Sequence, residues 1–240
     1  MLEWKEPMMR RNEAHRGGRM VHVSVKPVIL EGNLCIPADV HGIVVFAHGS
    51  GSSRTSPRNL AVADVLQRGG LATLLFDLLT PEEEQIDART NRHRFDLDLL
   101  ARRLAGAVVW LKQYPDTHTL QVGCFGASTG GGAALLAAAQ HPELIDVIVS
   151  RGGRPDLAGT ALPYVRAPTL LIVGGDDPAV RQMNEDAFLK IRATKHLAIV
   201  PGASHLFEEP GALEQVACLA RDWFCRYLSQ GTRQRNVGFD

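Results

Sequence analysis

Three short segments of this 240-residue chain carry a serine, an acid and a histidine in an order that suits nucleophilic catalysis. The segments are Gly126-Ala127-Ser128-Thr129-Gly130, Gly174-Gly175-Asp176-Asp177 and Gly202-Ala203-Ser204-His205. Each one follows an apolar run that is typical of a buried strand. The carboxyl ends of parallel strands meet at one edge of a sheet, so we expect these side chains to gather there. The residue types predict hydrolysis of an ester or a related acyl group.

Ser128 is the candidate nucleophile because it lies in a Gly-x-Ser-x-Gly motif. The motif stands between an apolar run at residues 120–125 and an Ala- and Leu-rich segment, expected to be a helix, at residues 130–140. A tight strand-to-helix turn strains the serine backbone and exposes its hydroxyl, and the glycines leave room where strand and helix nearly touch. The alternative is a glycine-rich packing turn without chemistry, which this context disfavours.

The segment His48-Gly49-Ser50-Gly51 follows another apolar run, at residues 43–47. The intermediate of acyl transfer carries a negative oxygen that backbone N–H groups can stabilise. We predict that Thr129, just after the nucleophile, and Ser50 supply these two N–H groups. A phosphate-binding or merely flexible loop is the alternative. The sequence has no G-x-x-x-x-G-K-[ST] motif, which argues against a nucleotide-binding P-loop.

His205 is the candidate general base. It lies in a short loop between the last expected strand and the last expected helix. Among the nine histidines, His48 is the other one at a strand end on this edge, and it belongs to the predicted oxyanion loop. The position of His205 after the serine and the acid therefore favours it as the base.

An acid must orient the imidazole of His205 and stabilise its charged form. We favour Asp177, because it follows a strand at the usual loop spacing and precedes Pro178, which biases it toward an extended backbone. Asp176 remains an alternative. Asp156, after the preceding strand, is a weaker one.

Apolar runs alternate with helical patterns along the chain, which predicts a doubly wound α/β sheet. The runs are continuous, as expected for a parallel sheet covered on both faces. The expected strands are residues 21–25, 28–36, 43–47, 72–76, 120–125, 147–150, 169–173 and 196–200. The expected helices are residues 58–68, 95–113, 130–140, 186–193 and 213–228. We predict a mostly parallel sheet of about 7–8 strands with helices on both faces.

Composition and charge narrow the class of protein. The chain has 26 Lys and Arg residues and 26 Asp and Glu residues, so its formal net charge is zero. A neutral protein is not drawn to nucleic acid or to an anionic membrane by its overall charge. The apolar runs are shorter than the ~18 residues of a spanning helix, and the charged N-terminus is unlike a secretory signal. We expect a mobile tail at residues 1–20, one domain at residues 21–230 and a second tail at residues 231–240.

Four cysteines, Cys35, Cys124, Cys218 and Cys225, stand at scattered positions without a metal-ligand spacing. We expect all four to be buried small apolar residues in a reducing compartment. Their usage therefore indicates a cytoplasmic protein.

With these motifs in this order, the chain resembles an α/β-hydrolase and is similar to the dienelactone hydrolase-like group. The resemblance covers residues 21–230 and rests on the segment His48-Gly49-Ser50-Gly51, the motif around Ser128, Asp177 and His205. It implies a triad that acts on a small-molecule acyl substrate and water, with no cofactor and no metal. Dienelactone hydrolases proper carry cysteine as the nucleophile, so Ser128 favours a serine esterase. Residues 151–168 are too few for a large cap domain, and the site should be fairly open.

Four arginines, Arg54, Arg58, Arg151 and Arg154, stand on loops that leave the catalytic edge. Guanidinium groups bind carboxylates well, which makes Arg54, Arg58 and Arg151 candidate substrate-binding residues. We favour the plainer interpretation, solvated surface charge or ion pairs, because charged loop residues usually need no function. The acids considered as partners are Asp77, Glu82 and Asp156.

Two other functions remain open beside serine hydrolysis. The same triad can transfer an acyl group or cleave a C–C bond, since the sequence does not identify the acceptor. The fold can also serve as a non-catalytic small-molecule receptor or interaction module, although an intact triad argues against that.

Overall fold

The computed structural model describes residues 18–228 and contains one sheet of eight strands. The strands are β1 Arg19–Val25, β2 Val28–Cys35, β3 Gly42–Ala47, β4 Leu71–Phe76, β5 Val122–Ala127, β6 Val147–Arg151, β7 Thr169–Gly174 and β8 Lys195–Val200. Their order in the sheet is β1-β2-β4-β3-β5-β6-β7-β8. β2 is antiparallel to both of its neighbours, and every other pair is parallel. The sheet is the mostly parallel α/β sheet that the sequence predicts.

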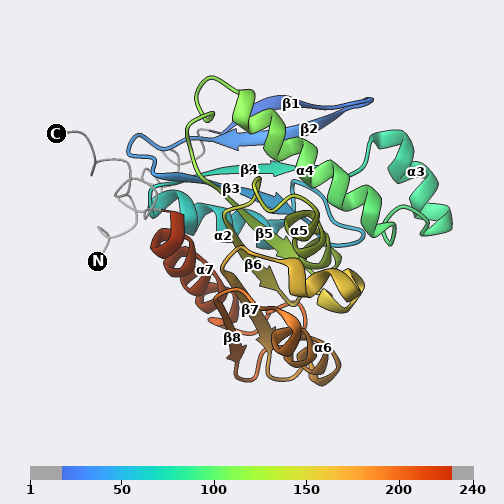
Figure 1. Cartoon of the computed structure of the whole chain (residues 1–240), viewed down its shortest axis with the longest axis vertical. Helices are drawn as coiled ribbons and strands as arrows, with labels where there is room; N and C mark the ends of the chain where they lie inside the picture. The colour runs from blue at the N-terminus through green and yellow to red at the C-terminus, as the bar shows by residue number, and fades with distance from the viewer. Residues whose placement is uncertain (1–17, 229–240) are drawn as a thin grey trace, which may run out of the picture.

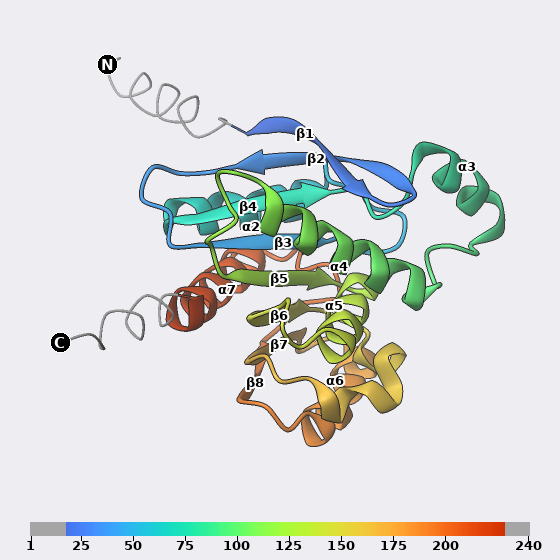
Figure 2. The ribbon, with the colours of Figure 1, turned by 45° about the horizontal axis from the view of Figure 1, so that its top comes forward.

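Helices cover both faces of this sheet, as Figures 1 and 2 show. They are α2 Pro57–Arg68, α3 Pro81–Thr90, α4 Leu97–Gln113, α5 Thr129–Gln140, α6 Pro178–Lys190 and α7 Ala212–Leu228, with the 3-10 helix η1 Pro155–Tyr164. α2 and α7 pack together on one face, whereas α4, α5 and α6 lie on the other. α3 stands away from the sheet, on the side toward which β4 and β5 point (Figure 2).

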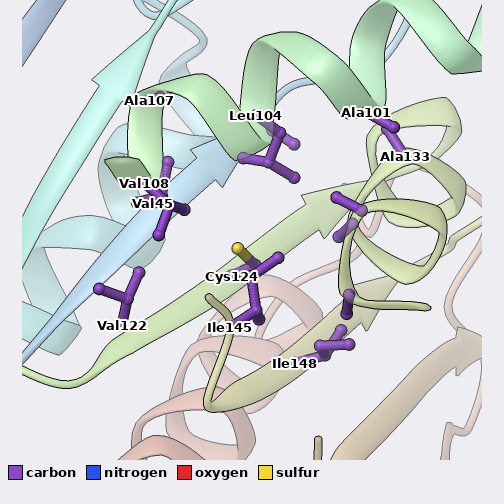
Figure 3. Close-up of a cluster of buried hydrophobic side chains, with 14 of the residues drawn as sticks. Val45, Ala101, Leu104, Ala107, Val108, Val122, Cys124, Ala133, Ile145 and Ile148 are labelled. Carbon is purple, nitrogen blue, oxygen red and sulfur yellow. The ribbon is translucent and has the colours of Figure 1, made fainter. Parts of the chain in front are cut away.

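A buried apolar cluster holds β5 in the centre of the molecule (Figure 3). Leu104 of α4 lies over Cys124 of β5, and Ala101 of α4 lies beside Ala133 of α5. The alanines allow the two helices to approach closely, and burying one leucine contributes about 1.5–3 kcal/mol. The packing therefore fixes the strand that leads directly to Ser128.

One helix was not expected and another begins earlier than expected, because neither has an apolar pattern in its first turn. α3, a charged segment that was not expected to be helical, begins with a capping box between Thr80 and Glu83. α6 begins at Pro178 rather than at residue 186, because the Asp177 side chain caps it. A further helix, η1, occupies part of the segment that was judged too short for a cap domain.

Two further expectations concern the ends of the chain and the burial of the four cysteines. Most of the two expected tails, at residues 1–17 and 229–240, lies outside the described residues, and β1 already begins at Arg19. Cys124 is buried, Cys35 and Cys225 are half-buried, and Cys218 is exposed. The expectation of four buried cysteines is wrong for Cys218, because this side chain stands on the solvent-facing side of α7.

Candidate active site

Ser128 lies at the point of the sheet where the strand order reverses. β3 pairs with β4 on one side and with β5 on the other, so the loops after β3 and β5 leave a crevice at the carboxyl edge. Ser128 has φ 51° and ψ −120°, a backbone conformation that residues other than glycine avoid because it is strained. This is the strained turn that the Gly-x-Ser-x-Gly motif predicts.

Backbone contacts hold Ser128 in this conformation. Its N–H donates to the carbonyl of Arg151 at 3.1 Å, and its carbonyl accepts the N–H groups of Gly131 and Arg154 at 3.0 Å. A Cβ atom at Gly130 would lie 2.1 Å from the carbonyl oxygen of Ala47, so only glycine fits where α5 meets β3. The serine is thus fixed by the strands and the helix around it.

His48 anchors the loop that follows β3. Its Nε2 accepts the N–H of Leu78 at 3.0 Å, and its Nδ1 lies 3.0 Å from the carbonyl oxygen of Gly49. An amide N–H can only donate, so Nε2 is unprotonated and Nδ1 carries the proton. Burial lowers the pKa of His48, which favours the neutral ring. Both ring nitrogens are occupied, and His48 has a structural role.

Ser50 and Thr129, the predicted oxyanion donors, are in side-chain contact. Their hydroxyl oxygens lie 2.8 Å apart, and the Ser50 hydroxyl also donates to the carbonyl of Arg94 at 3.3 Å. Thr129 is the first residue of α5, where a backbone N–H has no acceptor inside the helix. The structure therefore brings together the two residues that the sequence predicts for this role.

His205 and Asp177 bring an imidazole and a carboxylate into close contact at this site. Nδ1 of His205 lies 2.7 Å from Oδ2 of Asp177. The two other acids that were considered lie elsewhere. Asp176 is exposed, and Asp156 pairs with Arg154 at 2.7 and 2.8 Å. Among the three acids, the structure brings Asp177 to the imidazole.

Gly152 lies against the imidazole of His205. A Cβ atom at Gly152 would lie 3.5 Å from both Nδ1 and Cε1 of His205. The preceding residue, Arg151, accepts the N–H of Ser128. The end of β6 therefore contacts the predicted nucleophile and the predicted base through adjacent residues. Sequence reasoning missed Gly152, and the only signal for it was a Gly-Gly pair after a strand.

Two of the candidate arginines have acidic partners. Arg54 forms ion pairs with Asp77 and Glu31, and its backbone N–H also donates to Asp77 at 2.7 Å. Arg58, near the start of α2, contacts Glu208 at 3.1 Å. These pairs match the plainer interpretation of the sequence, although Glu31 and Glu208 were not among the acids considered.

Arg151 differs, because no acidic residue within residues 18–228 pairs with its buried guanidinium. The residue is 7% exposed, and its Nε and Nη1 have no hydrogen-bond partner among the described residues. Its Cζ lies 5.9 Å from the centre of the Phe207 ring. Burial, together with the charge of Arg58, lowers the pKa of Arg151 to about 10, so the group is cationic at neutral pH.

A cavity of about 550 Å³ adjoins the loop after β3. Its walls include Ser50 and Ser52 of that loop and Glu84 and Asp87 of α3. Burial and the nearby charge of Asp77 raise the pKa of Glu84. Neither Ser128 nor the imidazole of His205 belongs to its described lining, so the cavity meets the catalytic edge at Ser50.

Within residues 18–228, no group of three or more His, Cys, Asp and Glu side chains is placed to hold a metal ion. The same part of the chain contains no helix with the length and apolar character to cross a membrane.

Most of the described chain matches the model of a known protein family. The model of the dienelactone hydrolase family matches residues 30–228, from β2 to the end of α7. The chain belongs to the dienelactone hydrolase family. Family membership and fold together are those of a hydrolase family.

This dienelactone hydrolase family chain also matches curated proteins of Mycobacterium tuberculosis. It is 58% identical over 208 residues to proteins of strains CDC 1551 and H37Rv that are named "Putative phosphoribosyl transferase". The match covers 87% of this chain and 46% of each relative. The chain thus spans about half the length of the curated relatives it matches, and their name refers to the longer proteins.

Solved structures of the dienelactone hydrolase family and of esterases share the fold. The crystal structure of dienelactone hydrolase from Anabaena variabilis ATCC 29413 is 64% identical and has a TM-score of 0.87, covering 89% of this chain and 99% of that chain. Est1E from Butyrivibrio proteoclasticus is 16% identical with a TM-score of 0.72, covering 86% of this chain and 98% of that chain. The likeness to Est1E concerns the fold alone.

Proposed function

We propose that this chain is a serine hydrolase that cleaves a carboxylic ester, lactone or related acyl bond through an acyl-enzyme. The proposal is supported by the 2.7 Å contact between His205 Nδ1 and Asp177 Oδ2 and by the φ of 51° at Ser128. A carboxylate that orients an imidazole makes it the general base that a serine nucleophile needs, and a strained strand-to-helix turn exposes the serine hydroxyl.

In the proposed reaction, the Ser128 oxygen attacks the acyl carbon while His205 Nε2 takes the hydroxyl proton. Asp177 accepts the Nδ1–H of His205 and stabilises the imidazolium that forms. The imidazolium then returns its proton to the leaving alcohol, and an acyl-enzyme remains on Ser128. Water attacks this ester with His205 again as the base, which releases the acid and restores the serine.

The backbone N–H groups of Ser50 and Thr129 stabilise the oxyanion in the proposed intermediate. This assignment is supported by the 2.8 Å contact of the two side chains, which keeps the residues together at the carboxyl edge. Removing one such donor typically lowers kcat by about 10²–10³-fold. The ion pairs of Arg54 with Asp77 and Glu31 stabilise the loop after β3, which also carries Ser50. We therefore assign Arg54 to the structure of this loop rather than to substrate binding.

We further propose that Arg151, with Arg58 nearby, favours substrates that carry a carboxylate. Arg151 is the candidate whose buried charge has no acidic partner among the described residues. An anion beside it would compensate a charge that is otherwise costly to bury. Arg58 contributes less, since its charge is shared with Glu208.

The test is labelling of Ser128 by a fluorophosphonate probe, followed by a panel of p-nitrophenyl esters and lactones. We expect labelling at Ser128 and ester turnover, and a loss of about 10⁴–10⁶-fold in kcat for Ser128→Ala. A folded Ser128→Ala variant that keeps a tenth or more of the activity would show that the nucleophile is another residue. Absence of labelling would favour a non-catalytic receptor, and product formed only with an added alcohol would favour an acyltransferase.

A further inference from the structure

Asp87 is a buried carboxylate that the proposed mechanism does not use. It is 3% exposed and is the one buried residue of α3. Its Oδ1 accepts the N–H groups of His93 and Arg94 at 2.7 and 2.9 Å, and its Oδ2 accepts Nε–H of Arg94 at 2.6 Å. Burial alone would raise the pKa of Asp87, but these bonds outweigh it and hold the pKa below its usual value. Asp87 therefore fixes the turn after α3.

This turn reaches the predicted oxyanion hole through two hydroxyl groups. The Ser50 hydroxyl donates to the carbonyl of Arg94 at 3.3 Å. A hydroxyl has one proton, so the 2.8 Å contact between Ser50 and Thr129 has Thr129 as the donor. The bonds form one directed chain, from Thr129 to Ser50 to Arg94, and it ends at the turn that Asp87 fixes.

We propose that Asp87 is a positioning residue for the oxyanion hole and acts through Arg94, Ser50 and Thr129. The proposal rests on the serine hydrolase function proposed above. Asp87 lies in the wall of the cavity beside Ser50, so α3 connects that wall to the donors of the hole. The proposed reaction of Ser128, His205 and Asp177 does not itself use the Asp87 carboxylate. An effect of Asp87 on kcat would therefore come from positioning.

The loop that carries Ser50 needs such a positioning contact because its own backbone is flexible. Ser50 is exposed and lies between Gly49 and Gly51, and Gly51 has φ 69°, so the loop has a flexible backbone. A donor must lie about 2.7–3.1 Å from the developing oxyanion to be effective. If the loop moves freely, the backbone N–H is still present, but it is no longer held at this distance from the oxyanion. We expect this loss to be smaller than that of removing a donor, about tenfold in kcat.

Glu83 provides a matched control on the same helix. It forms an ion pair with Arg103 at 2.7 Å and, like Asp87, ties α3 to the rest of the protein. Its contacts are with Thr80 and Arg103, outside the chain of bonds that reaches Ser50. Loss of Glu83 therefore reports what happens when α3 is loosened without breaking that chain.

The experiment compares steady-state kinetics and fluorophosphonate labelling rates for a set of variants on one ester. The variants are Asp87→Asn, Asp87→Ala, Ser50→Ala, Thr129→Val, Thr129→Ser, Glu83→Gln and the double variant Asp87→Ala/Ser50→Ala. We expect kcat and labelling to fall about tenfold in Asp87→Ala and Thr129→Val, with KM changed by less than about threefold. Thr129→Ser, which keeps the hydroxyl, should recover most of the activity that Thr129→Val loses. Glu83→Gln should stay near wild type.

The double variant tests whether the residues act through one path. If they do, Asp87→Ala/Ser50→Ala should lose no more than the larger single loss, because the second change breaks a chain that is already broken. Losses that multiply, an unchanged kcat in Asp87→Ala, or an equal loss in Glu83→Gln would overturn the proposal. If Asp87→Ala does not fold, Asp87→Asn, which can keep its backbone acceptor, and the Thr129 pair decide. A wild-type protein that is neither labelled nor active would overturn the serine hydrolase function and the positioning role together.

Discussion

Nδ1 of His205 lies 2.7 Å from Oδ2 of Asp177, although 28 residues separate them in the chain. The contact follows from the pairing of β7 with β8 as parallel neighbours. Asp177 lies just after β7 and His205 just after β8, so both loops leave the same edge of the sheet. The pairing of two neighbouring strands thus brings the acid and the imidazole together.

This contact predicts a difference between two adjacent acids. Asp177→Asn should lower kcat by about 10⁴-fold, because asparagine does not stabilise the imidazolium and favours the wrong tautomer. Asp176→Asn should remain near wild type, because Asp176 is exposed. Steady-state rates of both variants on one ester check the prediction. The reverse ranking would move the acid to Asp176, and two variants near wild type would return attention to Asp156.

The unpartnered charge of Arg151 predicts a preference for anionic substrates. Arg151→Met should lower kcat/KM for a carboxylate-bearing ester about ten- to a hundredfold, the effect of losing a charge-assisted contact. The kcat/KM of Arg151→Met for a neutral ester of the same shape should stay near that of the wild type. Arg154→Met is the matched control, because Arg154 already pairs with Asp156. Equal rates of the wild type for charged and neutral esters at low salt would contradict the assignment.

The lowered pKa of Arg151 adds a pH dependence to the same preference. The guanidinium is charged below its pKa of about 10 and neutral above it. Affinity for a carboxylate-bearing product analogue should therefore be constant near neutral pH and fall as the pH rises through about 10. Calorimetry with the wild type measures this affinity, and Arg151→Met should bind weakly and without the fall. An arginine that stayed charged throughout would give a flat profile for the wild type.

The close approach at Gly130 predicts a loss of stability. Gly130→Ala would place a Cβ atom 2.1 Å from a carbonyl oxygen, so β3 and α5 must separate. We expect a cost of about 3 kcal/mol or more, the upper end for overpacking, and a fall in Tm of about 6 °C or more. Gly18→Ala is the control, because its Cβ atom would lie 3.8 Å from the carbonyl oxygen of Leu34, an ordinary contact distance. Thermal unfolding of the two variants makes the comparison, and equal Tm values would count against the described turn.

The sequence predicted the sheet well because buried parallel strands are continuously apolar. The run at residues 43–47 lies within β3, and that at residues 169–173 within β7. α3 was missed because its stability comes from caps and ion pairs at Thr80, Glu83 and Asp87 rather than from an apolar face. Likewise, the first half of α6 depends on a cap from Asp177, the residue that also contacts His205.

By itself the sequence determined the fold class, the strained position of Ser128 and the order of serine, acid and histidine. These features depend on local patterns, namely apolar runs, glycine spacing and the turn that glycine allows. The tertiary structure decided which acid meets His205, which arginine lacks a partner and how Asp87 reaches Ser50. Those outcomes depend on distances between side chains from different loops, and such distances arise only when the strands pair and the helices pack.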